Sequence, residues 1–200
     1  MANAVRVIRA AAWRSARAGR TRVVAIDGRS GAGKTSLAEV LGGELRAPVV
    51  SLEDLYGGWD GLEHGIDLLV SEVLMPFADE RAARVPRYDW LTREWAEPVL
   101  LEPPEVLIVE GVGAAARRAA AFESLLVWLE GAAAARKRLA LDRDGQTFAP
   151  HWDMWAAQEE AMLARERTPE RANVVIDGIS GTVLRSHMSL TLWYSMPRNQ

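Results

Sequence analysis

The sequence predicts an α/β fold in which a parallel sheet is covered by helices on both faces. Five short apolar runs, rich in Val, Ile or Leu, alternate along the chain with stretches of 3.6-residue periodicity. Such runs are typical of parallel strands buried on both faces, and the intervening helices imply right-handed crossovers. We therefore expect a three-layer α/β/α sandwich around a five-stranded parallel sheet.

The apolar runs are the expected strands, and they lie at residues 23–27, 48–52, 106–110, 125–129 and 173–177. The periodic stretches are the expected helices, at residues 35–45, 66–83 and 152–167. The interval 53–104 is longer than one crossover helix needs. In an open α/β sheet, additional residues at this position usually build a substrate site at the carboxyl ends of the strands.

Composition limits the class of protein. The chain has 200 residues, 49% hydrophobic and 26% charged, which suits one globular domain. A net charge of −3 gives no electrostatic reason to expect nucleic acid or an anionic membrane as partner. The absence of cysteine excludes disulfides and thiolate metal sites. No apolar run approaches the ~20 residues of a membrane span, so we expect a cytoplasmic protein.

The two ends differ from the central domain, which we expect to span residues 23–182. Residues 1–22 carry six arginines and no acid, a composition shared with organellar transit peptides. The helical spacing of Val5, Ile8 and Ala12 favours an amphipathic helix instead. Residues 183–200 lack clear periodicity and contain Ser-His-Met, a common cloning scar. This tail is typical of vector-derived sequence, and we exclude it from functional reasoning.

Residues 28–35, Gly-Arg-Ser-Gly-Ala-Gly-Lys-Thr, fill the phosphate-loop pattern G-x-x-x-x-G-K-[ST] between an expected strand and an expected helix. Glycines let successive backbone N–H groups surround a triphosphate, and the helix N-terminus adds its positive dipole end. A Gly-rich turn between core elements is the alternative. The pattern predicts an ATP site formed by Gly28, Ser30, Gly31, Ala32, Gly33, Lys34, Thr35 and Ser36.

Two side chains are expected at a Mg²⁺ ion beside this loop. The Thr35 hydroxyl can hold the ion, while Lys34 supplies charge to the β- and γ-phosphates. Glu110 ends the third expected strand, at the edge of the sheet that faces the ligand crevice. We expect Glu110 to contact Mg²⁺ directly or through water. A turn acid without a metal role is the alternative.

Glu53 and Asp54 follow the second expected strand and are candidates for the general base of phosphoryl transfer to an alcohol. Adjacent side chains on an extended segment point in opposite directions, so only one of them should face the phosphates. The other then caps the following turn.

A cationic cluster follows the fourth expected strand. Arg-Lys-Arg at 136–138 precedes Arg143, and Gly145 and Pro150 loosen the chain beyond it. We expect a lid over about 136–150 that brings arginines to the transferring phosphoryl group, with a solvated helix face as the alternative. In the 53–104 interval, Trp59, Trp90 and Trp95 suit stacking on a planar base.

Together these motifs resemble the uridine kinase and nicotinamide riboside kinase group of phosphate-loop kinases, over roughly residues 22–180. Residues 51–56, Ser-Leu-Glu-Asp-Leu-Tyr, look like that group's Ser-x-Asp-Asp-Phe-Tyr, whose first Asp is the catalytic base. The resemblance therefore implies that role for Glu53, with Asp54 as the alternative. It also implies lid roles for Arg138 and Arg143.

The resemblance extends to the substrate site. Residues 59–63, Trp-Asp-Gly-Leu-Glu, look like the segment that holds the nucleoside in riboside kinases, which implies base stacking by Trp59 and ribose binding by Asp60. Residues 85–90 are similar to the Pro-x-Tyr-Asp-Phe stretch that frames uracil, which implies substrate contacts for Tyr88 and Trp90. This chain has Arg93 nearest to the position where those enzymes carry a base-reading His.

The expectation that results is an ATP- and Mg²⁺-dependent kinase acting on a nucleoside or another ribosyl-like small molecule. A kinase for a non-nucleoside alcohol, such as an antibiotic or a vitamin precursor, is one alternative. A regulatory module that binds ATP without catalysis is the other. The oligomeric state is not predicted.

Overall fold

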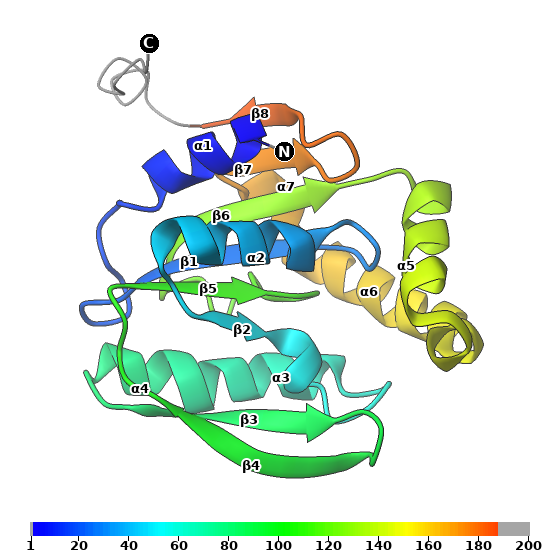
Figure 1. Ribbon diagram of the computed structural model, residues 1–200, viewed down its shortest axis with the longest axis horizontal. Helices are drawn as coiled ribbons and strands as arrows, with labels where there is room; N and C mark the ends of the chain where they lie inside the picture. Colours follow the sequence, from blue (N-terminus) through cyan, green and yellow to red (C-terminus); the bar gives the residue numbers. More distant parts are fainter. Residues whose placement is uncertain (1, 188–200) are drawn as a thin grey trace.

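The computed structural model describes residues 2–187 and shows helices on both faces of a central sheet (Figure 1). Within these residues the main sheet has six strands in the order β2-β5-β1-β6-β7-β8. Their bounds are β1 (Arg22–Gly28), β2 (Val49–Ser51), β5 (Val106–Glu110), β6 (Glu123–Glu130), β7 (Val174–Asp177) and β8 (Val183–Ser186). All neighbouring pairs are parallel except β7–β8. The predicted fold class is confirmed.

The sixth strand, β8, was not expected. It pairs antiparallel with β7, so that Ile176 lies opposite Val183 and Val174 opposite Ser186. β8 is four residues long and largely exposed, so it lacks the buried apolar run by which the other strands are recognised. Residues 183–187 of the presumed tail therefore continue the folded sheet, while 188–200 lie outside the described residues.

The two faces of the sheet are covered by different helices. α1 (Ala2–Ala11) and α2 (Lys34–Leu45) pack on one face, where Ile8 and Leu37 contact the core around Val24. The opposite face carries Val23 and Leu107 in a second core cluster. Successive residues of β1 thus point to opposite faces, which explains why both had to be apolar.

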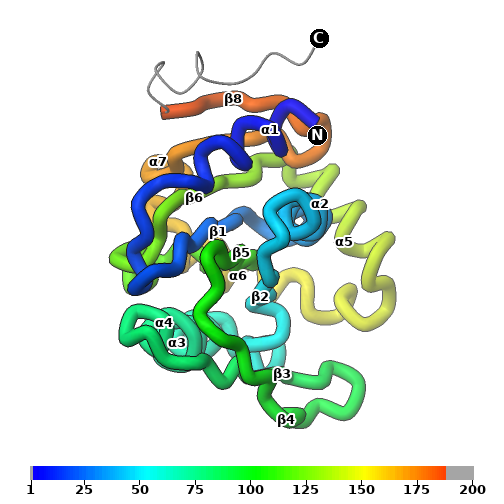
Figure 2. Tube along the Cα trace, turned by 60° about the vertical axis from the view of Figure 1, so that its left-hand side comes forward, coloured from blue at the N-terminus to red at the C-terminus, as the bar shows by residue number. Residues whose placement is uncertain are grey.

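The interval after β2 folds into a helical segment and a hairpin. It contains η1 (Leu52–Asp54), α3 (Leu62–Leu68), the π-helical η2 (Leu69–Leu74), α4 (Met75–Ala78), β3 (Ala83–Asp89) and β4 (Glu94–Leu101). Figures 1 and 2 show the helices beneath the sheet and the hairpin beyond them. The helical run begins before the predicted 66–83 and ends earlier, at Ala78.

The chain leaves β6 through α5 (Ala133–Phe148) and η3 (Ala149–His151), and returns through α6 (Trp152–Glu166) and α7 (Thr168–Arg171). Gly145 interrupts α5 with a non-helical backbone (φ 52°, ψ −129°), within the predicted lid. Because that φ is left-handed, glycine suits the break. Among residues 2–187, no helix is long and apolar enough to cross a membrane.

Candidate active site

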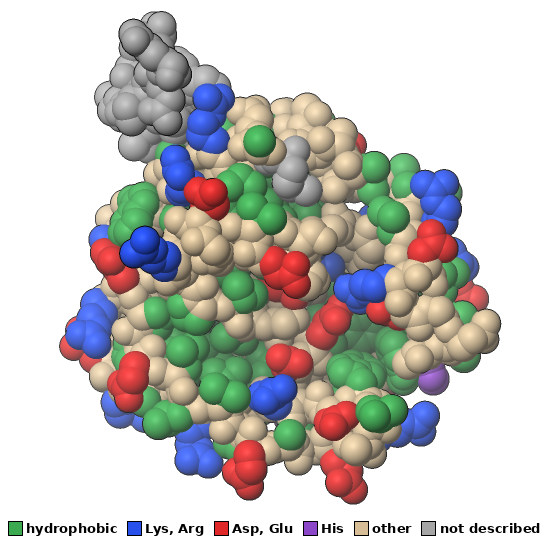
Figure 3. Space-filling model, viewed as in Figure 1, with side chains coloured by type: hydrophobic (Ala, Val, Ile, Leu, Met, Phe, Trp, Pro, Cys, Tyr) green, Lys and Arg blue, Asp and Glu red, His purple; other side chains and the backbone are tan. Residues whose placement is uncertain are grey.

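A cavity of about 680 Å³ lies where the phosphate loop, η1, the hairpin and α5 meet. β2, β5 and β1 are neighbours in the sheet, so their carboxyl ends bring Ser51, Glu110 and Gly28 to one edge. In Figure 3 this region is a hollow right of centre, with charged side chains around it and apolar side chains within. Parallel α/β sheets bind ligands at this edge.

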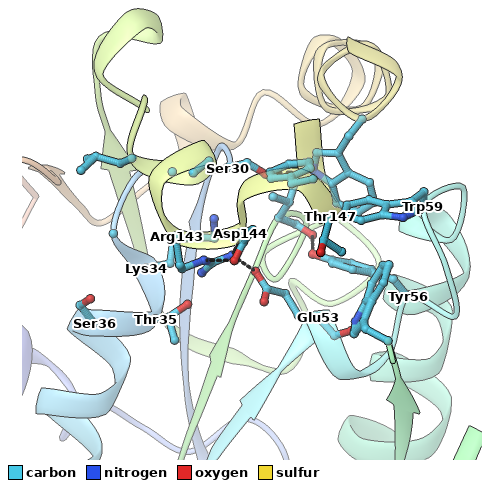
Figure 4. A pocket seen from close by; sticks show the side chains of 18 residues that line it. Ser30, Lys34, Thr35, Ser36, Glu53, Tyr56, Trp59, Arg143, Asp144 and Thr147 are labelled. Atoms are coloured by element: carbon cyan, nitrogen blue, oxygen red, sulfur yellow. Dashed lines mark hydrogen bonds and ion pairs between the residues drawn. The ribbon is translucent and has the colours of Figure 1, made fainter. Parts of the chain in front are cut away.

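The cavity has two sides. Figure 4 shows Lys34, Thr35 and Ser36 on one side, and Tyr56 and Trp59 on the other. Glu53 and Arg143 lie between these groups and face each other. A triphosphate on the first side and a small acceptor on the second would meet at Glu53 and Arg143.

The phosphate loop depends on its glycines. Gly31 and Gly33 have left-handed φ angles of 78° and 89°. A Cβ on Gly31 would lie 2.0 Å from the backbone oxygen of Arg136, so no side chain fits there. The Lys34 side chain is buried, and its Nζ donates a hydrogen bond to the Arg29 carbonyl at 3.2 Å. This bond holds the ammonium inside the curve of the loop.

The expected Mg²⁺ ligands lie next to each other. Thr35 Oγ1 is 3.4 Å from each carboxylate oxygen of Glu110, and Ser51 Oγ donates to Glu110 Oε1 at 2.7 Å. Burial raises the pKa of Glu110, while nearby Lys34 opposes the shift. Oxygen donors beside a phosphate loop suit Mg²⁺, which binds few protein groups and completes its shell with phosphate and water. The residues therefore fit the ion.

The structure separates the two candidate bases. Glu53 lines the cavity and Asp54 does not. Trp90 Nε1 donates to the Glu53 carbonyl at 2.9 Å, which fixes the backbone below the carboxylate. Asp54 is half-buried, and its burial raises its pKa while Arg87 opposes the shift. Of the two carboxylates, only that of Glu53 belongs to a residue that lines the cavity.

The two predicted lid arginines also differ. Arg143 lines the cavity and pairs with its neighbour Asp144 through two hydrogen bonds, Nε–Oδ1 at 2.8 Å and Nη2–Oδ2 at 2.7 Å. Its Nη2 also lies 3.1 Å from Glu53 Oε1. Bonding to these carboxylates raises the pKa of Arg143. Arg138 is exposed and does not line the cavity. Arg136, the first arginine of the predicted cationic cluster, is buried against the phosphate loop.

The predicted substrate residues are only partly brought together. Trp59 and Trp90 line the cavity, whereas Asp60, Tyr88 and Arg93 do not. Asp60 and Arg93 are exposed, and the latter lies in the β3–β4 turn. Tyr88 packs edge-on against the Trp90 ring at 5.3 Å between centroids.

Trp59 is already stacked on the lid. Its ring lies nearly parallel to those of Phe148 and His151, at 5.1 and 4.6 Å between centroids. Gln158 Nε2 in α6 donates to the Trp59 carbonyl at 2.8 Å. Trp59 therefore packs the predicted lid region against the insertion. Trp90 also lines the cavity, and among the described residues its ring packs against Trp59 and Tyr88 and not against the predicted lid.

Comparison with solved structures finds the same fold in other proteins. A structure described as a possible uridine kinase from Bacillus stearothermophilus matches with a TM-score of 0.64 and 20% identity, covering 88% of this chain and 98% of that one. A putative fructose transport system kinase from Silicibacter sp. TM1040 matches with a TM-score of 0.53 and 20% identity, over 84% and 91%. No protein-family model and no curated protein sequence matches the chain.

The chain therefore shares its fold with the possible uridine kinase and the putative fructose transport system kinase. At 20% identity the likeness establishes the fold, and the chemistry must be argued from the cavity.

Two buried acids that support the phosphate loop were not predicted. Asp27 is the penultimate residue of β1 and accepts backbone N–H bonds from Gly28 (2.7 Å), Gly113 (3.0 Å) and Ala115 (3.1 Å). It thereby ties the start of the phosphate loop to the turn after β5. Burial raises the pKa of Asp27 to about 6, and the three N–H donors oppose the shift. Its place at the end of a buried strand was a usable signal. Glu159 in α6 is the second acid, and no sequence motif marks it.

Proposed function

We propose that this protein is an ATP-dependent kinase that transfers the γ-phosphoryl group of ATP to a hydroxyl group of a small molecule. The observation that carries the proposal is the position of Glu53 and Arg143, which face the phosphate loop across one cavity. A general base and a cation between a triphosphate site and an aromatic compartment are the parts that transfer to an alcohol needs.

ATP binding is assigned to the phosphate loop. The backbone N–H groups from Gly31 onward and the buried Lys34 would surround the β- and γ-phosphates. Thr35 and Glu110, with Ser51 behind them, would hold Mg²⁺, which supplies charge neutralisation at the phosphates. The burial of Glu110 keeps solvent away from this side of the site.

The transfer step follows from the contacts of Glu53. The Glu53 carboxylate accepts the proton of the acceptor hydroxyl. The hydroxyl oxygen forms a bond to the γ-phosphorus while the bond between the γ-phosphorus and the β–γ bridging oxygen breaks, and ADP leaves. Glu53 Oε1 is paired with Arg143 in this structure. When Arg143 turns to the transferred phosphoryl group, the carboxylate is released for the hydroxyl proton.

The acceptor side favours a ring-bearing alcohol. Tyr56, Trp90 and Trp155 give the compartment an aromatic wall. The Tyr56 hydroxyl donates to the Val112 carbonyl at 2.9 Å, and Trp155 Nε1 donates to Ser30 Oγ. A nucleoside or ribosyl-like substrate suits this wall.

The exposed position of Asp60, outside the cavity, favours the second candidate, a ring-bearing alcohol without ribose. Two statements stay predictions. One is that the acceptor is a free small molecule, with no nucleic acid or membrane partner. The other is that the enzyme acts in the cytoplasm.

An acceptor panel tests the proposal. ADP release is measured with MgATP and a set of ribonucleosides, matched by aromatic alcohols that lack ribose. We expect one acceptor class to raise ADP release well above the acceptor-free rate, and Lys34→Ala to abolish that rise. If a ribonucleoside is the substrate, Asp60→Ala decides whether its diol is read by Asp60. ATP binding with no acceptor-dependent release would support the regulatory-module alternative.

A further inference from the structure

Ser30, the third residue of the phosphate loop, is hydrogen-bonded through each of its polar groups to a residue of α5 or α6. Its backbone N–H donates to Glu159 Oε1 at 2.8 Å. Its carbonyl accepts from Arg136 Nη1 at 3.0 Å, and its hydroxyl oxygen accepts from Trp155 Nε1 at 2.9 Å. The N–H and carbonyl are therefore occupied by protein groups, while the Ser30 hydroxyl lines the cavity and keeps its own proton for donation to a ligand.

Glu159 is the buried centre of this cluster. Its side chain is 1% exposed, and Oε1 also accepts from Trp155 Nε1 at 3.1 Å. Oε2 accepts from Arg29 Nε at 3.1 Å. Bonds to an ionised carboxylate are about twice as strong as those between neutral groups. Glu159 therefore joins two consecutive loop residues, Arg29 and Ser30, to α6.

The two side-chain donors to Ser30 are Arg136, at the first residue of the predicted lid, and Trp155, five residues after its end. Arg136 precedes the segment 137–154, and Trp155 follows it. The backbone of Arg136 lies against the loop so closely that a Cβ on Gly31 would be 2.0 Å from its oxygen. Between Arg136 and Trp155 lie Arg143 and the backbone break at Gly145. A Cβ added at Gly145 would meet nothing within 4 Å. The loop thus contacts both residues that flank the segment carrying Arg143.

We propose that Glu159 is a positioning residue of the nucleotide site: it fixes the phosphate loop through Arg29 and Ser30, and with Arg136 and Trp155 it couples the loop to the lid. This inference rests on the proposed function only in taking the loop as a nucleotide site. It predicts that loss of Glu159 weakens binding of MgADP as well as MgATP, because both present a β-phosphate to the loop.

The experiment compares Glu159→Gln with Glu160→Gln in the full chain. Glu160 is the matched control, since it also pairs with Arg29 (Nη1, 3.3 Å) but its side chain is 76% exposed. The dissociation constants of MgADP and MgATP are measured by calorimetry, with the unfolding midpoint of each variant recorded without nucleotide. We expect Glu159→Gln to raise both constants about tenfold, equal to ~1.4 kcal/mol, and Glu160→Gln to change them less than twofold.

A second set of variants covers the case in which Glu159→Gln does not fold. Ser30→Ala removes the acceptor of the Oγ–Nε1 bond. Trp155→Phe removes its donor, together with the bond from Nε1 to Glu159 Oε1, and both variants keep most of the packing. If the coupling is real, their effects on MgADP affinity are not additive in the double variant, as expected for a shared contact.

The outcomes are separable from those of the proposed function. A folded Glu159→Gln protein that binds MgADP as the parent chain does would overturn the positioning role, as would additive effects of Ser30→Ala and Trp155→Phe. Tight MgADP binding that Glu159→Gln weakens, with no phosphorylated acceptor found, would support the positioning role and count against the kinase. Absence of nucleotide binding by the unaltered chain would overturn both.

Discussion

Replacing Glu53 by Gln removes the proposed base and changes little else. The amide keeps the shape of the side chain, and the backbone carbonyl still accepts from Trp90 Nε1. The lost ion pair to Arg143 joins side chains that are 52% and 53% exposed, so it contributes at most about 1 kcal/mol to stability. The variant should therefore fold. Loss of a general base typically slows the chemical step by about 100- to 10,000-fold.

Asp54→Asn is the matched control, because it makes the same chemical change one residue further along, outside the cavity. With the acceptor found in the panel, kcat at saturating MgATP is measured for the parent chain and both variants. The dissociation constant of MgATP is measured separately. We expect kcat of Glu53→Gln to fall by about 100-fold or more with nucleotide affinity within threefold, and Asp54→Asn to keep kcat within tenfold.

Two results would refute this reasoning. If Asp54→Asn lost more activity than Glu53→Gln, the base would be the other carboxylate and the present geometry would not be the reactive one. If both variants kept a third or more of kcat, neither carboxylate of this segment would act as an essential base.

Two further predictions follow from the packing. Gly31→Ala should abolish MgATP binding in calorimetry, because its Cβ would lie 2.0 Å from the Arg136 backbone oxygen. The control is Gly43→Ala, whose Cβ would meet nothing within 4 Å; it should bind MgATP normally and add about 0.5–1 kcal/mol of stability in the helix interior. Normal binding of MgATP by Gly31→Ala would contradict the loop geometry. Burial raises the pKa of Glu123 to about 8 despite Arg171, and one of its oxygens is buried without a partner among the described residues. The folded state then holds this proton between about pH 4.5 and 8 while the unfolded state releases it, so stability falls with rising pH by up to about 1.4 kcal/mol per unit. Glu123→Gln should therefore raise the unfolding midpoint at pH 9 and not at pH 5, and a difference independent of pH would contradict the burial argument.

Most of the sheet was predictable because its signal is local. The run 106–110 is buried along its whole length, and its last residue, Glu110, reaches the loop edge as the strand pattern indicates. β8 was not predictable, since four largely exposed residues that pair at an edge have no apolar pattern. The hairpin β3–β4 was likewise not distinguished within the long insertion, because β4 is exposed along most of its length.

The phosphate-loop site was predictable from the motif, while its supports were not. Glu159 lies 129 residues from Ser30 in the chain, and its role appears only when α6 packs beside the loop. The cationic run at 136–138 predicted arginines near the nucleotide, but helix geometry buries Arg136 and exposes Arg138. Likewise, the sequence predicted that the Trp59 ring stacks on a planar group, but spacing alone could not show that it stacks on the His151 ring.

The central claim is that the γ-phosphoryl group of ATP ends on a hydroxyl of a small acceptor. The most direct test is the mass of the acceptor after incubation with the unaltered chain and MgATP, compared with the same mixture containing Lys34→Ala. We expect an acceptor heavier by one phosphoryl group, formed in equal amount to ADP and absent with Lys34→Ala. ADP formed together with free phosphate, and an acceptor of unchanged mass across the panel, would contradict it.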